Sequence, residues 1–495
     1  MNKAIGQGGF RAVVIGAGMS GVLMAIRLMQ AGIDDVTIYE KGDRVGGTWR
    51  ENSYPGLRCD VPSHHYCYSF DPNPEWSSYC SSGAEIRQYF EDSAKRFGVF
   101  DRIRFNAAVV EGRWENKQWR LTLADGSVDQ ADVLISAAGI LHIPAIPAIP
   151  GIDSFAGAMF HTARWDHSIA LADKRVGIIG TGSTAAQVIS AQAGNTRQFS
   201  IFQRTAQWVI RVPNPSFSEK QKKRFRTYPF LLRWHYENLR LQLAALMTGA
   251  IMGQDPAARQ ALEAGLEANL ESVVDPELRS KLRPDYLAGC KRLVMSPDFY
   301  EAIQRPQTEL ITTKIAGIEP EGVRTSDGQM YPLDVLILAT GFDPNAYLRP
   351  VRLYGRNGRS LDEVWAARPI AYHSMAVPDM PNFFMLEGPF SPIGNLSVVL
   401  ISEWQADYVM RCVDIVRRER VALSPTPEAT DELMTRYRAA ARKTIWATGG
   451  CRSWYQDEEG VPIIYPFSPD DFRAETQGEP DRLDFVIEEL HPVAA

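Results

Sequence analysis

Two short apolar runs, each followed at once by closely spaced glycines and then by a helical pattern, organise this chain of 495 residues. The first run covers residues 11–15, and the second covers residues 175–179. A strand that leads through a glycine turn into a helix begins a βαβ unit, and such units build parallel sheets. The pattern therefore predicts an α/β protein with two doubly wound, Rossmann-like domains.

Weaker patterns fill the space between the two runs. Residues 85–97 predict a helix, and residues 114–128 predict a hairpin that turns at Asp125-Gly126. Residues 132–139 predict a buried strand that ends in small residues. Three prolines at three-residue spacing then keep residues 141–150 extended, and this stiff stretch marks a domain boundary.

The second half of the chain begins with amphipathic helices over residues 213–281. Their apolar face is expected to contain Trp234, Tyr236, Leu239, Leu243 and Leu246. We favour a helical cover over a membrane anchor, because the most apolar run, residues 241–253, is shorter than the ~20 residues that span a bilayer. A buried strand at 334–342 contains Gly341 and is expected to return the chain to the first domain, and residues 400–416 predict another helix.

The first glycine turn has the spacing of a dinucleotide-binding site. Gly16 permits the tight turn, Gly18 lets a pyrophosphate approach the backbone, and Gly21 lets the helix pack on the strand. The amino terminus of that helix offers free N–H groups and a positive dipole end to the phosphates. A second strand ends at Glu40, 19 residues after Gly21, where an acid binds ribose hydroxyls.

The second glycine turn differs from the first where its next strand ends. Alanine stands at 185 in place of the third glycine, and Arg204 stands where an acid closed the first unit. An arginine accommodates the 2′-phosphate that an acid would repel, so this unit predicts NADPH rather than NADH, with a surface charge as the alternative for Arg204. The residues expected to contact this cofactor are Gly180, Gly182, Ser183, Arg204 and Thr205.

Composition narrows the remaining possibilities. Hydrophobic residues at 45% and charged residues at 23% describe an ordinary globular protein. The net charge of -6 provides no basic field, so nucleic acid is not expected as a partner. The first ten residues contain no apolar core of a signal peptide, and we expect a cytoplasmic protein without an integral membrane segment.

Cysteine and histidine positions give no sign of a redox or metal centre. The six cysteines form no Cys-x-x-Cys pair, which favours reduced thiols, with Cys290 expected to serve in packing. His64 and His65 have no partner at metal-ligand spacing and are expected to face solvent. The sequence therefore predicts no metal site.

Two longer motifs are specific enough to indicate a family. Residues 46–60 contain Gly-Gly47-x-Trp49-x-x-x-x-Tyr54-Pro-Gly-x-x-x-Asp60, and residues 155–166 contain Phe155-x-Gly157-x-x-x-His161-x-x-x-Trp165-Asp166. Both resemble signatures of Baeyer–Villiger monooxygenases, which convert ketones to esters or lactones. Related N- and S-oxidising flavin monooxygenases usually have Tyr or Phe at the position of Trp165. The resemblance extends from Arg11 to about Phe472, although many members have Pro where Asp166 stands.

The resemblance implies FAD and NADPH as cofactors. Gly47, Trp49, Tyr66 and Gly341 would lie along the flavin, with Asp60 near the isoalloxazine ring. Lys291 would bind the 2′-phosphate of NADPH, and Arg292 would be the catalytic arginine that Asp60 orients. A permanent guanidinium charge stabilises the deprotonated flavin C4a-peroxide that attacks a ketone.

The resemblance also implies how the domains divide. The FAD-binding domain would comprise residues 1–147 and 335–495, and the NADP-binding domain residues 148–212 and 289–334. Residues 213–288 would form a helical subdomain. The segment from Phe155 to Asp166 would link the domains, with Gly157 as its hinge and with His161 and Trp165 assisting domain rotation and NADP positioning.

The implied reaction inserts one oxygen atom of O2 beside the carbonyl of a small-molecule ketone, whose size the sequence does not define. An N- or S-oxygenating monooxygenase is the alternative, and an NADPH oxidase that makes only H2O2 is a second. Trp454 either reaches the substrate pocket or, as we favour, is buried in the FAD-binding domain.

Overall fold

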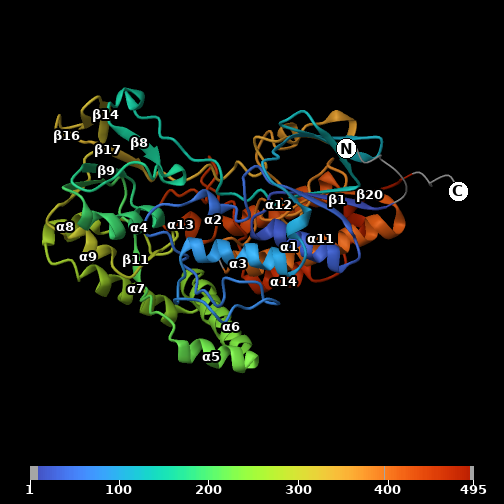
Figure 1. Cartoon of the computed structure of the whole chain (residues 1–495), viewed down its shortest axis with the longest axis horizontal. Coiled ribbons are helices and arrows are strands. Elements are labelled where there is room, and N and C mark those ends of the chain that lie inside the picture. The colour runs from blue at the N-terminus through green and yellow to red at the C-terminus, as the bar shows by residue number, and fades with distance from the viewer. Residues whose placement is uncertain (1–8, 395, 491–495) are drawn as a thin grey trace.

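The computed structural model describes residues 9–394 and 396–490, and it contains two parallel five-stranded sheets at opposite ends of the long axis (Figure 1). The first sheet has the order β19-β7-β1-β2-β3, and its strands are β1 (Arg11–Ile15), β2 (Asp35–Tyr39), β3 (Ile103–Arg104), β7 (Val133–Ser136) and β19 (Phe383–Met385). Helix α1 (Met19–Gln30) packs against α3 (Gly83–Arg96) and α11 (Val398–Glu419). This sheet and its helices confirm the first predicted Rossmann-like domain.

The predicted hairpin is one part of a small antiparallel meander. Strands β4 (Val109–Glu115), β5 (Gln118–Leu123) and β6 (Val128–Ala131) follow one another, and β18 (Arg352–Tyr354) pairs with the outer edge of β4. The turn at Asp125-Gly126 is confirmed, since Gly126 has a φ of +82°. A second turn at Asn116-Lys117, with both residues at positive φ, was missed because neither residue is a glycine.

The second sheet has the order β13-β10-β9-β17-β8. Its strands are β8 (Ala158–His161), β9 (Arg175–Ile179), β10 (Gln198–Phe202), β13 (Thr308–Ile311) and β17 (Val335–Leu338), and its helices include α4 (Ser183–Gln192) and α9 (Phe299–Ile303). Strand β17 lies between β9 and β8, so the prediction that residues 335 onward return to the first domain is wrong for this strand. An apolar run of this length is compatible with a strand of either sheet. The ion pair between Asp334 and Arg175 connects it to β9 of the second sheet.

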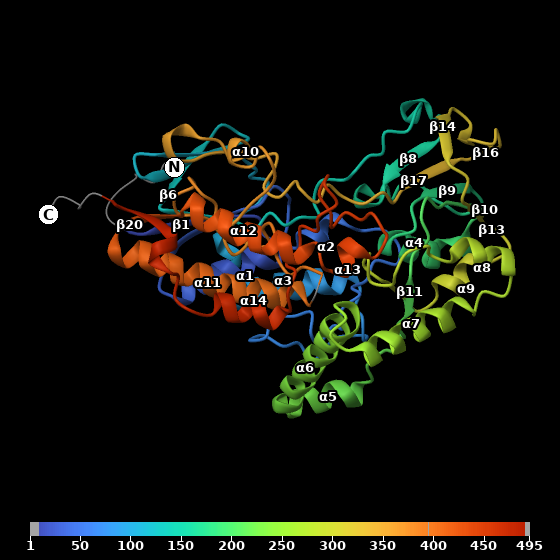
Figure 2. The ribbon, with the colours of Figure 1, turned by 180° about the vertical axis from the view of Figure 1, so that it is seen from behind.

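The helical insertion is confirmed, and it comprises α5 (Glu219–Thr227), α6 (Pro229–Ala244), the π-helical segment η5 (Ala245–Ile251), α7 (Pro256–Leu270) and α8 (Pro276–Leu282). Its helices α5 and α6 lie below both sheets in Figures 1 and 2, whereas α8 lies beside the second sheet. Ser218 closes a capping box on α5, and Asp255 and Asp275 cap α7 and α8, each of which begins with proline.

The predicted apolar face of α6 is correct for Tyr236 and Leu239, which are buried, but wrong for Trp234. The Trp234 side chain is 66% exposed, because residues two positions apart on a helix point to opposite sides. No helix among residues 9–394 and 396–490 combines the length and the apolarity needed to cross a bilayer.

The inner face of α6 covers His64 and His65, and both are buried, contrary to the expectation that they face solvent. The His65 ring lies 4.6 Å from the ring of Tyr236, and the His64 ring lies 5.2 Å from that of His235. Burial lowers the pKa of each of the two histidines to about 3, so both are neutral and pack as aromatic rings. The sequence offered no sign of this, because the helix that covers them begins more than 160 residues later.

Short elements complete the chain. The remaining strands are β11 (Val209–Arg211), β12 (Val294–Ser296), β14 (Ile315–Glu319), β15 (Gly322–Thr325), β16 (Met330–Pro332), β20 (Val421–Pro425) and β21 (Phe485–Glu489). The remaining helices are α2 (Thr48–Glu51), α10 (Leu361–Val364), α12 (Pro427–Ala441), α13 (Ile445–Thr448) and α14 (Pro469–Thr476), with 3-10 turns at Phe100–Arg102, Ile152–Ser154, Thr162–Arg164, Ala193–Asn195, Arg356–Gly358 and Arg482–Asp484.

Candidate functional site

The first glycine turn forms a close backbone crossing at the end of β1. Gly16 has a φ of +102°, and a Cβ atom there would lie 2.6 Å from the carbonyl oxygen of Ala137. A Cβ atom on Gly47 would lie 3.0 Å from the Cα atom of Gly18, and one on Gly21 would lie 1.8 Å from the Gly16 carbonyl oxygen. Helix α1 begins here with neither a side-chain cap nor an acid in its first turn. Its first N–H groups are therefore available to a pyrophosphate, and the turn fits the predicted FAD.

Glu40 lies at the end of β2, as predicted, and its carboxylate also organises the glycine turn. It accepts hydrogen bonds from the backbone N–H groups of Ala17 at 2.8 Å and Gly42 at 2.7 Å. Its charge partner is Arg50, at 2.6 Å, which the sequence analysis missed although Arg50 directly follows Trp49 in the first signature. The ion pair offsets the cost of burying the carboxylate beside the proposed ribose position.

Trp49 and Tyr66, predicted to line the flavin, lie against each other. The Trp49 indole N–H donates to the Tyr66 hydroxyl at 3.2 Å, and the two rings meet edge to face with centroids 5.5 Å apart. Burial raises the pKa of Tyr66 well above its ordinary value, so the hydroxyl stays protonated. The structure therefore brings these two residues of the signature together.

The charged centre of the site is a bidentate ion pair between Asp60 and Arg292, which are 232 residues apart in the sequence. Arg292 Nη2 lies 2.8 Å from both carboxylate oxygens, and Nε lies 3.1 Å from Oδ2. The Asp60 carboxylate raises the pKa of Arg292 further above its ordinary value. The guanidinium is thus a permanent, oriented cation, which is the arrangement that the resemblance implied.

Tyr455 is a third member of this centre, and the sequence analysis did not identify it. Its side chain is 2% exposed, and the Arg292 guanidinium donates toward its hydroxyl. Burial raises the pKa of the Tyr455 phenol and Arg292 opposes that rise, so the phenol remains neutral. Its place directly after Trp454 was the one available signal.

The second glycine turn repeats the geometry of the first. Gly180 has a φ of +113°, and a Cβ atom there would lie 2.4 Å from the carbonyl oxygen of Ala339. Helix α4 follows Gly182, beginning at Ser183, again without a side-chain cap or an acid in its first turn. The Thr205 carbonyl accepts a hydrogen bond from the Thr181 hydroxyl at 3.2 Å, which ties the end of β10 to this turn.

Two cations lie beside this second turn. Arg204 is exposed at the end of β10, and Lys291 lies with its Nζ atom 4.9 Å from the centre of the Tyr286 ring. Burial lowers the pKa of Lys291, and the charge of Arg204 lowers it further. Two cations that repel each other across one space create a position for an anion, as expected for the 2′-phosphate of NADPH.

The segment from Phe155 to Asp166 is integrated into the second sheet, because its centre forms the edge strand β8. A Cβ atom on Gly157 would lie 2.6 Å from the Asp334 carbonyl oxygen, so glycine is needed there for close packing. The contacts of the segment include the edge-to-face packing of Trp165 on Phe160 at 5.0 Å, the His161 ring 5.9 Å from that of Phe342, and a hydrogen bond from the Ser168 N–H to Asp166. The role of this segment in domain rotation stays a prediction.

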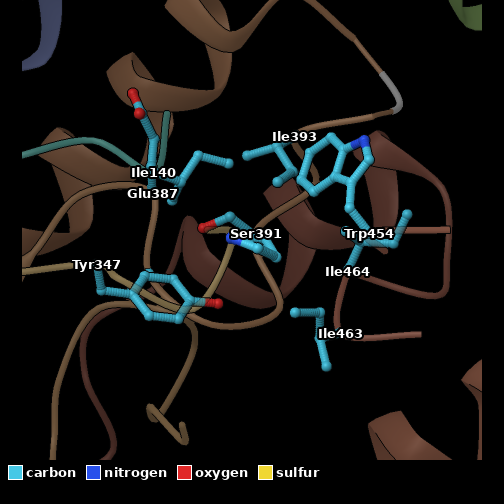
Figure 3. Close-up of a pocket in the computed structure, with 10 residues that line it drawn as sticks. Ile140, Tyr347, Glu387, Ser391, Ile393, Trp454, Ile463 and Ile464 are labelled. Atoms are coloured by element: carbon cyan, nitrogen blue, oxygen red, sulfur yellow. The ribbon is translucent and has the colours of Figure 1, made fainter. Parts of the chain in front are cut away.

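A small, mainly apolar pocket lies next to the first glycine turn (Figure 3). Glu387 on its wall accepts hydrogen bonds from Ser20 of α1 at 2.5 Å and from Ser402 of α11 at 2.8 Å. Trp454 lies on the opposite wall beside Ile393 and is 39% exposed, so the expectation that Trp454 is buried is wrong. The other lining residues are Ile140, Pro344, Tyr347, Gly388, Ser391, Ile463 and Ile464.

Gly341, which was predicted to lie along the flavin, has a φ of +80°, and a Cβ atom there would meet no other atom within 4 Å.

The cysteines are not all reduced. Cys290 and Cys451, 161 residues apart, form a disulfide, whereas Cys59, Cys67, Cys80 and Cys412 are free and buried. The prediction of six thiols rested on the absence of a short Cys-x-x-Cys spacing, which gives no information about pairs distant in sequence. The disulfide lies beside Lys291 and Arg292, so the correction concerns the site directly.

Proteins with similar sequences are monooxygenases, in agreement with the geometry of this site. Residues 9–223 match the family model of flavin-binding monooxygenase-like proteins. The chain is 46% identical to an uncharacterised monooxygenase of Mycobacterium tuberculosis, with 93% of each chain covered. It is 35% identical to a Baeyer–Villiger monooxygenase of Streptomyces coelicolor, covering 94% of this chain and 91% of the relative.

Solved structures give the same result. The closed crystal structure of cyclohexanone monooxygenase superposes with a TM-score of 0.86 at 28% identity, covering 98% of this chain and all of that one. An oxidised steroid monooxygenase bound to NADP matches with a TM-score of 0.85 at 30% identity, over 97% of this chain and 100% of that one.

Two glycine turns and the Asp60–Arg292 ion pair fit a flavin-dependent monooxygenase, and residues 9–223 match the flavin-binding monooxygenase-like family. Within that family, the chain belongs to the Baeyer–Villiger monooxygenases. The predicted family, fold class, enzyme activity and cofactor pair are thereby confirmed.

Proposed function

We propose that this enzyme inserts one oxygen atom of O2 next to the carbonyl group of a small-molecule ketone, with Asp60 and Arg292 as its catalytic pair. FAD, reduced by NADPH, supplies the oxygen-activating chemistry when it is bound. The observation that carries the assignment of the catalytic pair is the bidentate contact of Arg292 with Asp60 at 2.8 Å. A ketone that gains oxygen in this way becomes an ester or a lactone.

Arg292 acts as a fixed positive charge. A guanidinium held by two carboxylate oxygens cannot lose its proton at working pH and does not need to reorganise when negative charge develops beside it. One preorganised donor of this kind lowers a barrier by roughly 3–4 kcal/mol. Asp60 would orient the guanidinium, and its carboxylate would partly neutralise the local positive charge when a hydride is delivered from NADPH to FAD.

The remaining residues divide between the two cofactors. The first glycine turn, with Glu40, Trp49 and Tyr66, would hold FAD, whose pyrophosphate fits the uncapped amino terminus of α1. The second turn would hold NADPH, with Arg204 and Lys291 on its 2′-phosphate. Comparing kcat/KM for NADPH and NADH tests this division, and a preference for NADH would contradict it.

The reaction itself is tested with purified, FAD-loaded protein, NADPH and a panel of linear, cyclic and polycyclic ketones. In 18O2 the product should gain one labelled oxygen atom and appear by mass spectrometry as an ester or lactone. A thioether assayed in parallel separates the alternatives: oxidation of the thioether or of amines without any ketone product would indicate an N- or S-oxygenating enzyme. Stoichiometric H2O2 without an oxygenated product would indicate an NADPH oxidase.

A further inference from the structure

The disulfide between Cys290 and Cys451 joins the loop that carries Arg292 to the carboxyl-terminal segment that carries Tyr455. The two Cα atoms are 6.1 Å apart. Beside the crosslink, the Leu287 N–H donates to the Gly449 carbonyl at 2.9 Å. A Cβ atom on Gly449 would lie 2.7 Å from the Cβ atom of Cys290, so the two backbones are in close contact. The disulfide and this hydrogen bond hold the loop on the segment, and the Arg292 guanidinium of the loop also donates toward the Tyr455 hydroxyl of the segment.

The carboxyl-terminal segment, residues 449–456, is fixed to its surroundings. The Gln456 side-chain amide donates to the carbonyl oxygens of Trp446 at 2.6 Å and Cys451 at 3.3 Å. The Ile463 N–H donates to the Tyr455 carbonyl at 2.7 Å, and the Tyr455 ring packs on that of Trp446. The segment thus provides a firm support.

The loop of residues 283–293 is anchored at Tyr286, whose hydroxyl donates to the Ala206 carbonyl at 2.9 Å and whose carbonyl accepts from the Trp208 indole at 2.8 Å. It follows the end of α8 at Leu282 and precedes β12 at Val294, and it contains no helix or strand of its own. Gly289 within it has a φ of +86°, a conformation that glycine adopts without strain. Cys290 lies one residue from Lys291 and two from Arg292, so a displacement of this part of the loop would move the cation and remove the preorganisation that electrostatic catalysis requires.

We propose that the Cys290–Cys451 disulfide is a positioning element that keeps Arg292 paired with Asp60. The inference rests on the proposed function, because coupling of NADPH oxidation to oxygen insertion depends on that pair. Reduction by a dithiol transfers two electrons and two protons: the S–S bond breaks to two thiols, and the dithiol closes to its own disulfide. The reduced enzyme keeps FAD and oxidises NADPH, but more of the oxygen leaves as H2O2.

The first measurement is a thiol count on FAD-loaded protein, denatured with and without prior reduction. Four thiols are expected before reduction and six after it. Six thiols before reduction would overturn the proposal. Amide hydrogen exchange of the native enzyme then measures, independently of activity, how strongly the crosslink stabilises the loop. Residues 283–293 should exchange at least about tenfold faster after reduction, because native hydrogen bonds there open more often.

The second measurement compares the double variant Cys290→Ser/Cys451→Ser with wild type. The double variant should release about threefold or more H2O2 per NADPH oxidised, while flavin reduction by NADPH changes by less than about twofold. Dithiothreitol should give wild type the same behaviour and leave the double variant unchanged. Unaltered coupling and exchange in the double variant would overturn the proposal, as would an equal effect of the reductant on both proteins.

Cys412→Ser is the matched control, because Cys412 is a buried free thiol on α11. It should lower the Tm without raising H2O2 release, and an equal rise would show a general packing effect and overturn the proposal. If wild type forms no ester from any ketone, the proposed function fails by itself. The thiol count and the exchange rates still decide whether the crosslink holds the loop.

Discussion

At the scale of single residues, Asp60 and Arg292 show how a contact across the whole sequence creates a permanent charge in a partly enclosed site. The side chains are 18% and 34% exposed, and three hydrogen bonds fix their geometry. The family resemblance predicted both residues, Asp60 from the first signature and Arg292 from the Lys291-Arg292 segment, because family motifs record positions along the chain. Tyr455 and Arg50 were missed, because the contacts of Tyr455 depend on folding and Arg50 has no fixed place in the signature.

Replacement of the arginine should separate NADPH oxidation from oxygen insertion. Arg292→Ala is expected to lower ester formation by about 10²–10³-fold, because the preorganised cation is lost, whereas NADPH oxidation continues and yields H2O2. Product mass and peroxide release measured together check this. Arg352→Ala, which changes an exposed arginine on β18, is the control and should leave both rates unchanged. Undiminished ester formation by Arg292→Ala would remove Arg292 from the catalytic pair.

The lowered pKa of Lys291 predicts a pH dependence of NADPH binding. Lys291 binds a phosphate only while it is protonated, and burial with the charge of Arg204 moves its pKa below the ordinary 10.5. The KM for NADPH should therefore be low at neutral pH. As the pH is raised, this KM should begin to increase before pH 10.5 is reached, while the KM for NADH stays constant. Lys291→Arg should abolish the rise, because arginine keeps its charge throughout. A pH profile of wild type identical to that of Lys291→Arg would contradict the assignment.

At the scale of elements, helix α6 shows that hydrophobic periodicity predicts the position of a helix better than it predicts which side chains are buried. The sequence located the helical insertion, and the caps at Ser218, Asp255 and Asp275 explain its boundaries. The face was assigned correctly for Tyr236 and Leu239 but not for Trp234, because an aromatic residue near an apolar stripe reads as part of it. Likewise, the burial of His64 and His65 follows from α6 packing on them, which no local pattern records.

The two sides of α6 should respond differently to truncation. Leu239→Ala, at a side chain that is 4% exposed, should lower the free energy of unfolding by about 2–5 kcal/mol through loss of burial and a cavity. Trp234→Ala, at 66% exposure, should change it by no more than about 0.5 kcal/mol. Urea unfolding of both variants against wild type measures the difference. Equal destabilisation would mean that the outer side of α6 is covered in solution.

At the scale of the whole molecule, the two parallel sheets were predictable because each begins with its own glycine turn. The boundary between the domains was not, since β17 is an apolar run that fits either sheet and is assigned by its neighbours β9 and β8. The disulfide between Cys290 and Cys451 belongs to the same class of feature, because its two cysteines are 161 residues apart and only the folded chain brings them together.

The domains meet where the first signature packs on helix α4 of the second domain. The Tyr54 hydroxyl donates to the Gln187 side chain at 3.0 Å, and the same side chain donates to the Arg58 carbonyl at 3.0 Å. Gly56 has a φ of +85°, and a Cβ atom there would lie 2.6 Å from the Gln187 carbonyl oxygen. Asp60 follows this contact by four residues, so the contact links the position of the Asp60–Arg292 ion pair to the domain of the second sheet.

Gly56→Ala should therefore disturb the packing of the two domains on each other more than the fold of either domain. The strained φ costs on the order of 1–3 kcal/mol, and the clash with α4 adds a displacement that strain alone does not produce. We expect FAD to be retained, the Kd for NADP+ to rise by about tenfold, and H2O2 release to increase. Gly126→Ala isolates the strain, because Gly126 has a φ of +82° with open space around it. If both variants lose stability and bind NADP+ equally well, the contact at Gly56 does not couple the domains.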